Sequence, residues 1–289
     1  MNIVENKKIF FIISLAIIFT GIVMYFINGV NYGIDFTGGT IIEMNAGQFI
    51  PVDEVKKIVD EFDPNMSIIH GGTDKHELII KSTLDLSNAD ISAIGDKFAE
   101  VYNVDKKNNI QSDKNGPSMG REIREKALLS ICIAAVAMLG YITFRFEFKF
   151  GVAAIIALLH DVLVTISVYI IFKLPVNSSF IAAILTIVGY SINDTIVIFD
   201  RIREEMKLNP KDGYENVVNN SIKHSYRRTI NTTITTVLAV LILYIFGVDD
   251  VKVLALPLLL GMIAGTYSSI FIAPALWYNF KTYKIKTAK

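Results

Sequence analysis

The sequence is poor in the residues from which disulfides and metal sites are built. Its one cysteine, Cys132, lies in an apolar run, so an internal disulfide is excluded. Only four histidines are present, and none belongs to a His or Cys cluster with ligand spacing, whereas zinc requires three or four converging ligands. A nucleophile triad and a nucleotide-binding motif are also missing. We therefore expect no metal, no cofactor and no enzymatic activity.

Charge is scarce as well. The 28 basic and 28 acidic residues cancel, so no overall field favours nucleic acid as a partner. Charged residues make up 19% of the chain, against roughly 25% in average globular proteins. Hydrophobic residues make up 52% and gather in long runs, which is typical of a membrane protein.

Six of these runs approach or exceed the about 20 residues that a membrane-spanning helix needs. The first is longer than the roughly 7–15-residue core of a signal peptide and no cleavage pattern follows it, so we interpret it as a retained span. One span, about a hundred polar residues and then five closely spaced spans predict a polytopic α-helical membrane protein. The spans are residues 9–27, 127–144, 150–172, 180–199, 230–246 and 253–278.

Lysine and arginine in the short loops orient these spans, because cytoplasmic loops are enriched in them. One side holds Lys7, Lys8, Arg145, Lys149, the basic residues between 201 and 228, and the C-terminal lysines. The opposite short loops hold only Lys173 and Lys252. We expect a multi-pass protein of the cell membrane with both termini cytoplasmic. The predicted division is a tail (1–8), a first helix (9–28), an extracytoplasmic domain (29–126), a five-helix bundle (127–279) and a tail (280–289).

The region between the first and second spans has a different periodicity. Alternating apolar residues predict strands, and apolar residues at helical spacing predict two helices, the second capped by Ser87 or Asn88. The order β-α-β-β-α-β is that of the ferredoxin-like α+β fold. The predicted strands are 40–44, 67–69, 78–80 and 109–112, and the predicted helices are 52–62 and 91–102.

Two spans carry acids in mid-run, although a charge at the bilayer centre costs about 2.5–3.5 kcal/mol on insertion scales. The third span contains His160 and Asp161, and the fourth contains Ser191, Asn193 and Asp194. On a helix, Asn193 and Asp194 share a face, and Ser191 lies three residues before Asp194. Asp194 is therefore a candidate proton carrier, with hydrogen bonding for packing as the alternative. His160 and Asp161 are either a relay or a pair in which the histidine neutralises the acid.

Arg227 and Arg228, at the start of the fifth predicted span, are candidate partners for Asp194. Both are alternatively interfacial anchors whose charges extend to the cytoplasmic surface. Gly261 and Gly265, spaced as G-x-x-x-G, predict close helix packing and no chemistry.

The segment from Gly33 to Thr40 contains Asp35, Phe36, Gly38 and Gly39 and resembles the D-F-x-G-G signature of the SecD/SecF family, which belongs to the RND superfamily. The fourth-span sequence GYSINDT, followed by DRIRE, resembles the SecF branch. So do ALLHD in the third span and SYRRT before the fifth.

The resemblance implies a six-span half of a pseudo-twofold transporter. It implies a SecD-type partner, a SecY-type channel complex, an unfolded exported polypeptide as substrate, and use of the proton-motive force to complete export. By position, Asp194 matches the family's proton-responsive aspartate and Arg228 its charge partner. The glycine motif after the first span would be the structural joint to the external domain.

Other functions remain open at this point. A half-transporter of the RND type for small molecules or lipids would use the same acid, and a passive scaffold of the translocon would not need it. An intramembrane hydrolase is disfavoured, since His160 and Asp161 lack an H-E-x-x-H context. Sodium is an alternative to the proton, because an acid flanked by hydroxyls could bind either.

Overall fold

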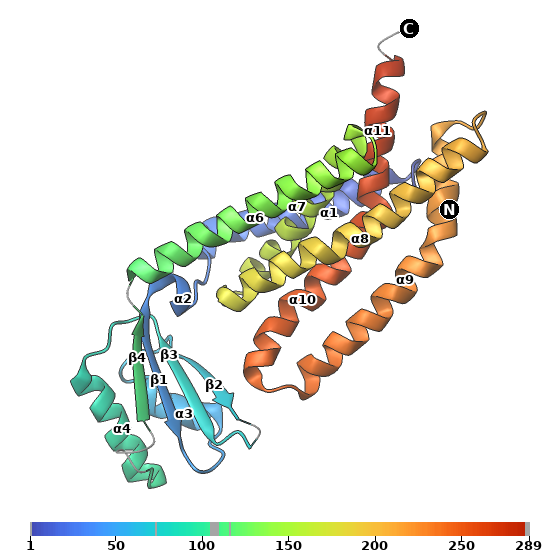
Figure 1. Ribbon diagram of the computed structural model, residues 1–289. Helices are drawn as coiled ribbons and strands as arrows, with labels where there is room; N and C mark the ends of the chain where they lie inside the picture. Colours follow the sequence, from blue (N-terminus) through green and yellow to red (C-terminus); the bar gives the residue numbers. More distant parts are fainter. Residues whose placement is uncertain (1, 73, 105–109, 116, 287–289) are drawn as a thin grey trace.

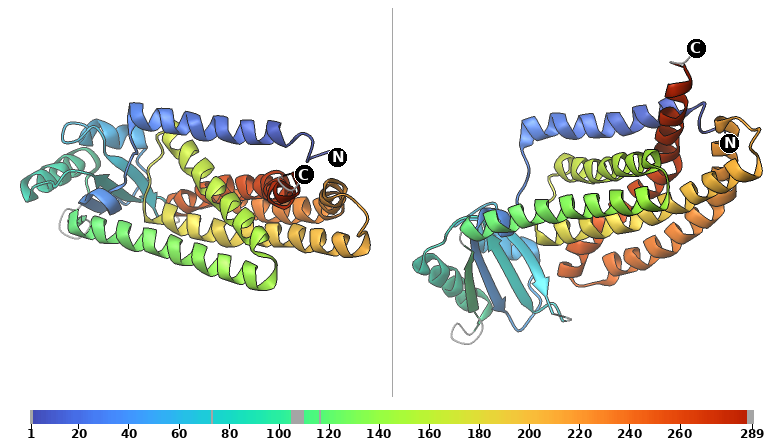
Figure 2. Two further views of the ribbon diagram at one scale, coloured as in Figure 1. Left: turned by 90° about the horizontal axis from the view of Figure 1, so that it is seen from above. Right: turned by 45° about the horizontal axis from the view of Figure 1, so that its top comes forward.

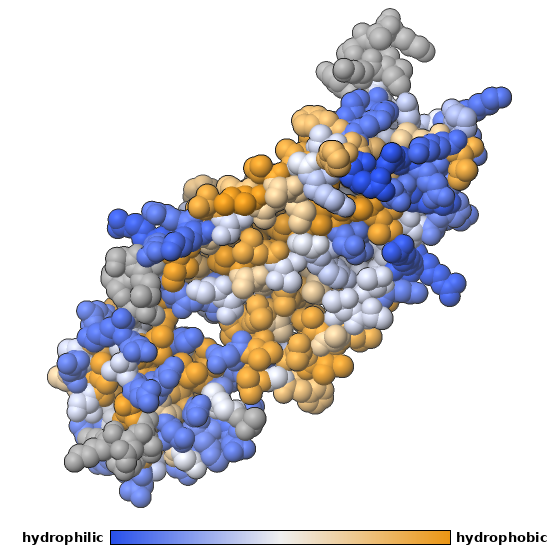
Figure 3. Space-filling model, viewed as in Figure 1, coloured by the Kyte–Doolittle hydropathy of each residue, from blue (hydrophilic) through white to orange (hydrophobic). Residues whose placement is uncertain are grey.

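The computed structural model describes residues 2–286 apart from 73, 105–109 and 116. Long helices form an elongated bundle, and a small α+β domain lies at one end of it (Figure 1). Both termini lie towards the other end. Hydrophilic residues gather at the two ends and hydrophobic ones between them (Figure 3), as expected of a bundle that spans a membrane.

Six helices in the described part of the chain are long and apolar enough to cross a membrane, and each contains one predicted span. The polytopic fold is therefore confirmed. α1 and α6 run along the outside of the bundle (Figure 2) and are its least buried spans. The helices are α1 (Lys7–Asn28), α6 (Pro117–Arg145), α7 (Phe148–Ile171), α8 (Ser178–Leu208), α9 (Tyr214–Phe246) and α10 (Asp249–Tyr267), which continues into η1 (Ser268–Ile272) and α11 (Ala273–Lys286).

The connection between the fourth and fifth spans is shorter than the predicted span ends, residues 199 and 230, imply. α8 continues to Leu208 and α9 begins at Tyr214, so Arg227 and Arg228 lie within a helix and not at its start. The reason is an apolar stripe that hydropathy alone does not detect. Ile202 of α8 and Val218 and Ile222 of α9 are fully buried in the main core, together with Trp277.

The sixth span is interrupted. The helical turns from Ser268 to Ile272 are a π-helix, whose i→i+5 hydrogen bonds are rare and occur frequently at functional sites. The segment places Ser268 and Ser269 in the interior, both fully buried.

The α+β domain has the predicted ferredoxin-like order. Its antiparallel sheet runs β2-β3-β1-β4, and Ile42, Met44 and Ile80 belong to the same hydrophobic core as residues of both helices. The Ser87 hydroxyl caps the second helix in a capping box with Asp90, which settles the choice of cap. Residue 109, predicted in the last strand, lies outside the described residues, as does the end of the predicted C-terminal tail. The elements are β1 (Gly39–Asn45), α3 (Val52–Val59), β2 (Ser67–Gly71), β3 (Glu77–Ser82), α4 (Asn88–Tyr102) and β4 (Ile110–Asn115).

A short helix that the sequence did not predict, α2 (Ile34–Thr37), joins the first span to this domain. Asp35 Oδ2 accepts a 2.7 Å hydrogen bond from Ser178 N, which satisfies a free amide at the start of α8. Phe36 is buried in an apolar cluster with Phe180 of α8. The motif therefore attaches the joint to the fourth span.

The two glycines of the motif redirect the chain into β1. Gly38 and Gly39 have φ of 77° and 145°, a region that favours glycine. A Cβ on Gly39 would lie 2.1 Å from the Ser82 carbonyl oxygen of β3, so a side chain there would also break the start of the sheet.

The domain also contacts the bundle through its edge strand. Asp249, the first residue of α10, accepts a 3.2 Å hydrogen bond from the His70 amide of β2 and pairs with Lys252. His70 is itself buried, and its Nε2 lies 2.7 Å from the Ile50 carbonyl. The Asp249 carboxylate therefore accepts a hydrogen bond from a backbone N–H at the sheet edge that would otherwise be unpaired. α10 thus connects the domain to the membrane core.

α10 packs directly against α8 through the predicted glycine pair. A Cβ on Gly261 would lie 2.1 Å from Ile187 Cδ1 and 2.5 Å from its Cγ1, and a Cβ on Gly265 would lie 2.8 Å from Ser191 Cβ. These glycines hold η1 and the polar part of α8 at close range.

We expect Gly261→Ala to lower the free energy of unfolding by about 1–3 kcal/mol, because the added methyl overpacks the α8–α10 contact. Gly140→Ala on α6 is the matched control. Nothing lies within 4 Å of its added Cβ, and alanine favours a helix interior over glycine by up to about 1 kcal/mol. Thermal unfolding of the two purified variants in detergent measures the difference. Equal melting temperatures would contradict the assigned contact.

Candidate functional site

Asp161 of α7 is the centre of a buried polar network. Its Oδ2 accepts hydrogen bonds from Ser191 Oγ of α8 at 2.6 Å and from Ser268 Oγ of η1 at 2.9 Å. Its Oδ1 lies 3.0 Å from His160 Nδ1. The carboxylate is fully buried, and the three neighbours account for its main hydrogen-bonding positions.

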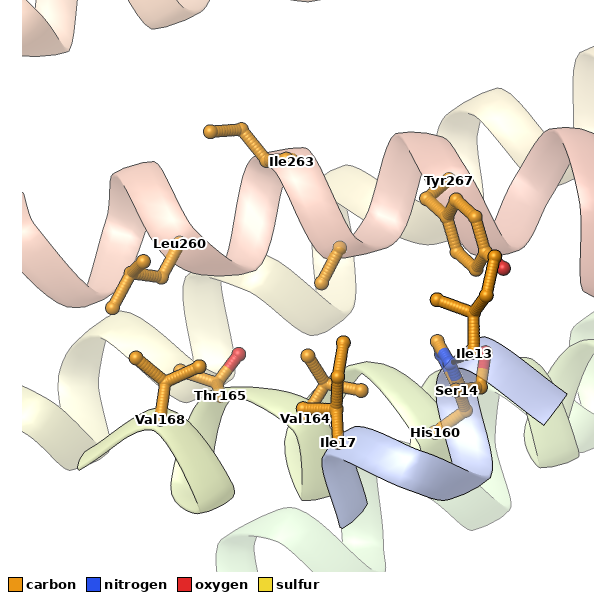
Figure 4. Close-up of a pocket in the computed structure, with 11 residues that line it drawn as sticks. Ile13, Ser14, Ile17, His160, Val164, Thr165, Val168, Leu260, Ile263 and Tyr267 are labelled. Carbon is orange, nitrogen blue, oxygen red and sulfur yellow. Dashed lines mark hydrogen bonds between the residues drawn. The ribbon is translucent and has the colours of Figure 1, made fainter. Parts of the chain in front are cut away.

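The network reaches the first span through the other side of the histidine ring. His160 Nε2 lies 2.8 Å from Ser14 Oγ of α1. Both side chains lie at one end of an apolar cavity of about 280 Å³ between α1, α7 and α10, beside Tyr267 (Figure 4). Asp161 and His160 therefore connect four separate helical segments, which are α1, α7, α8 and η1.

Asp194 of α8 has a different environment. Its side chain is 3% exposed, yet among the described residues Oδ2 has no hydrogen-bond partner. The Thr233 hydroxyl and the exposed Arg228 guanidinium, both on the adjacent α9, act electrostatically on the carboxyl group, but no ion pair within 4 Å joins Asp194 and Arg228 in the described residues. Asp194 thus has an unpaired oxygen and a cation on the next helix, whereas both oxygens of Asp161 are hydrogen-bonded.

Hydroxyl groups fill the space around the two acids. Thr195 and Ser269 are 2.7 Å apart, and Ser269 Oγ donates to the Ser191 carbonyl at 3.2 Å. Thr233 and Thr266 are 2.8 Å apart. Two further buried hydroxyls, Tyr190 OH and Thr229 Oγ1, have no partner in the described part of the chain. Unpaired buried groups of this kind are the usual positions of ordered water.

The structure brings together most of the predicted site residues. His160, Asp161 and Ser191 form one network, and the charge of Arg228 on α9 acts on Asp194 of α8 without a direct ion pair. Asn193 is the exception. Its side chain is exposed on the outer side of α8, so the amide does not join Asp194 although the two residues are adjacent in sequence. Consecutive residues of an α-helix are rotated by about 100° about its axis, so when the Asp194 side chain points inward the Asn193 side chain does not.

Three residues of the site were missed from the sequence. Ser14 is a hydroxyl in an otherwise apolar first span, and Thr233 belongs to the threonine-rich turn after Arg228. Ser268 follows the Gly261 and Gly265 pair in the last predicted span. Each is a polar residue inside a predicted span, and this is the sequence feature that could have identified them as site residues. Within the described residues, no three His, Cys, Asp or Glu side chains converge as a metal site.

Two family models match the chain. The model described as protein export membrane protein SecD/SecF, C-terminal, matches residues 94–283, and the SecD/SecF GG motif matches residues 26–48. The second match covers the joint, and the first covers both acids and Arg228.

Individual proteins match over almost the whole chain. The protein translocase subunit SecF of Helicobacter pylori is 36% identical, with 96% of this chain and 90% of the relative covered. The protein translocase subunit SecDF of Bacillus subtilis is 34% identical, with 98% of this chain but 38% of the relative covered. The crystal structure of SecDF from Thermus thermophilus superposes with a TM-score of 0.82 at 33% identity, covering 98% of this chain and 39% of that chain.

Proposed function

Because the chain belongs to the SecD/SecF family of protein export membrane proteins, we propose that it uses the proton-motive force to promote the completion of protein translocation. Membership of this family makes the chain a multi-pass membrane protein with a role in protein translocation. The proposal adds the energy source, the partners and the residues that act.

The observation that carries the proposal is the Asp194 carboxyl group, buried, incompletely hydrogen-bonded and opposite Arg228. When Asp194 is ionised, the guanidinium of α9 attracts it. When it is protonated, that attraction is lost and α8 is free to shift against α9. One charge crossing the full field is worth about 2.3 kcal/mol per 100 mV, so a few protons supply a useful stroke.

The movement would reach the external domain through α10. α10 packs on α8 at Gly261 and Gly265 and begins at Asp249, which contacts β2 of the α+β domain. We propose that this domain is extracytoplasmic and holds the emerging unfolded polypeptide, and that both termini are cytoplasmic. The position of the domain at the end of the bundle away from the termini supports this orientation.

We propose a SecD-type subunit as partner. The chain spans 38% of the Bacillus SecDF and 39% of the Thermus SecDF, so in those proteins the corresponding region is one part of a longer chain. The exposed Asn193 amide of the fourth span supports the idea, because a polar group facing lipid is costly and a partner helix would cover it. The same complex would act at a SecY-type channel. We assign the chain no enzymatic turnover of its own.

Export into proteoliposomes tests the proposal. Vesicles would contain the channel, this chain and its SecD-type partner, with ATP hydrolysis stopped after the precursor has entered the channel. We expect an imposed proton gradient to complete translocation and a sodium gradient of equal size to leave it unchanged. Equal completion with and without a proton gradient would favour the passive scaffold, and a response to sodium alone would reassign the coupling ion.

A further inference from the structure

A polar cavity of about 380 Å³ lies between α8 and α9, one helical turn beyond Asp194. It begins at Val197, three residues after Asp194, and extends along both helices towards their connection. This direction leads away from the α+β domain (Figure 1). The lining residues are Val197, Asp200, Arg201, Glu204, His224, Ser225 and Arg228.

Arg228 belongs to both the cavity and the site. Its positive charge acts electrostatically on the Asp194 carboxyl group, and the residue also lines the cavity. The cavity residue Val197 lies one turn of α8 from Asp194. A shift of that arginine on protonation of Asp194 would open the connection.

His224 lines the cavity, and its ring contacts a glutamate, Glu205, that lies outside the lining. Glu205 of α8 is 4% exposed, and its Oε1 lies 3.0 Å from His224 Nδ1 of α9. Arg201 Nη2 donates to the same Oε1 at 3.2 Å, and Asn209 Nδ2 donates to Oε2 at 2.7 Å. Glu205 is therefore a buried, fully engaged carboxylate that orients the imidazole.

This arrangement leaves one ring nitrogen of His224 free. His224 Nδ1 lies between Glu205 Oε1, which only accepts, and Arg201 Nη2, which only donates and is 3.1 Å away, while Nε2 has no hydrogen-bond partner among the described residues. In the protonated ring, Nδ1 donates its hydrogen to Glu205, so this carboxylate stabilises the imidazolium. The His224 side chain is 53% exposed, so water reaches it. Among side chains, histidine is the one whose ordinary pKa lies closest to the pH of the cytoplasm.

We propose that this cavity is the cytoplasmic exit of the coupled proton and that His224, held by Glu205, is the base that receives the proton there. The inference rests on the proposed proton-driven function. The proton leaves the Asp194 carboxyl oxygen for a water molecule in the cavity, and that water passes a proton to the unprotonated ring nitrogen of His224. His224 then releases it to bulk water, so that Asp194 is left ionised and His224 neutral.

The charges around His224 favour this role. Asp200, Glu204 and Glu205 of α8 supply three carboxylates, against the guanidinium groups of Arg201 and Arg228. The surplus negative charge attracts a proton into the cavity, while Arg228 at the inner end repels its return to Asp194.

Proton-driven export by the His224→Gln variant tests the inference in the full complex with its partner. Glutamine keeps a polar side chain but has no base, so we expect the rate to fall about tenfold, below the full range for general acid–base catalysis because water substitutes in part. Small diffusible buffers such as imidazole, added on the cytoplasmic side, should restore the rate. Lys223→Gln, an exposed neighbour outside the cavity, is the matched control and should keep the full rate.

The outcomes separate this inference from the proposed function. A wild-type rate for His224→Gln at all buffer concentrations, with proton dependence intact, would refute the proposed proton exit through His224. The proposed proton-driven function would still stand. A slow variant that buffer does not rescue would show a structural role and would also overturn it. Loss of proton dependence in the wild-type complex itself would instead refute the proposed function.

Discussion

Asp194→Asn should abolish proton-driven export while leaving the chain folded and bound to its partner. Asparagine has the same shape, and Oδ2 of the native carboxyl forms no hydrogen bond that the change would break. What is lost is the titrating group that Arg228 faces. Export should then proceed at the rate seen without a gradient. At 100 mV the loss of one coupled proton corresponds to up to about 50-fold, from about 2.3 kcal/mol.

The measurement is completion of translocation with and without a proton gradient, for the variant and the native chain side by side. Asp85→Asn makes the same chemical change at a carboxyl that is 83% exposed in the α+β domain, and it should keep the native response. Co-purification with the SecD-type subunit checks that assembly is intact. If Asp194→Asn still responded to the gradient at the native rate, Asp194 would be a packing residue and the proposed proton-driven function would be wrong.

Asp161→Ala should destabilise the protein severely. It removes the acceptor for Ser191, Ser268 and His160. The Ser268 hydroxyl keeps its hydrogen bond to the Gly265 carbonyl, but Ser191 Oγ and His160 Nδ1 are left buried and unpaired, each costing about 1–3 kcal/mol. The loss lies in the centre of the bundle, where α7, α8 and η1 meet. We expect a loss of several kcal/mol of unfolding free energy and little folded protein at physiological temperature.

Thermal unfolding in detergent, together with the yield of monodisperse protein, measures this effect. Asp161→Asn keeps one oxygen acceptor and should lie between the native chain and the alanine variant. Asp85→Ala deletes an exposed carboxyl and should change the free energy of unfolding by less than about 0.5 kcal/mol. A melting temperature of Asp161→Ala close to that of Asp85→Ala would mean that the network contributes little to stability, and Asp161 would become a second candidate for the titrating role.

Hydropathy and periodicity predicted most of the architecture because they depend on residues close together in the chain. A run of apolar residues identifies a span whatever it packs against, and alternation identified the strands of the α+β domain and hence its fold. The same local reasoning failed between residues 200 and 229. There a helix is stabilised by burial of Ile202 and Ile222 against Trp277, more than 50 residues further along the chain.

The sequence by itself determined that the chain crosses a membrane, that its α+β domain is ferredoxin-like, and that acids lie inside the spans. Only the tertiary structure decided which groups each acid contacts. His160 meets Ser14 across 146 residues, and Ser268 meets Asp161 across 107, so no local pattern encodes these pairs. Both oxygens of Asp161 are hydrogen-bonded and connect several helices, whereas one oxygen of Asp194 has no hydrogen-bond partner in the described residues. The physical reason is that a carboxylate's behaviour in hydrocarbon depends on its nearest partners, which the fold supplies from distant segments.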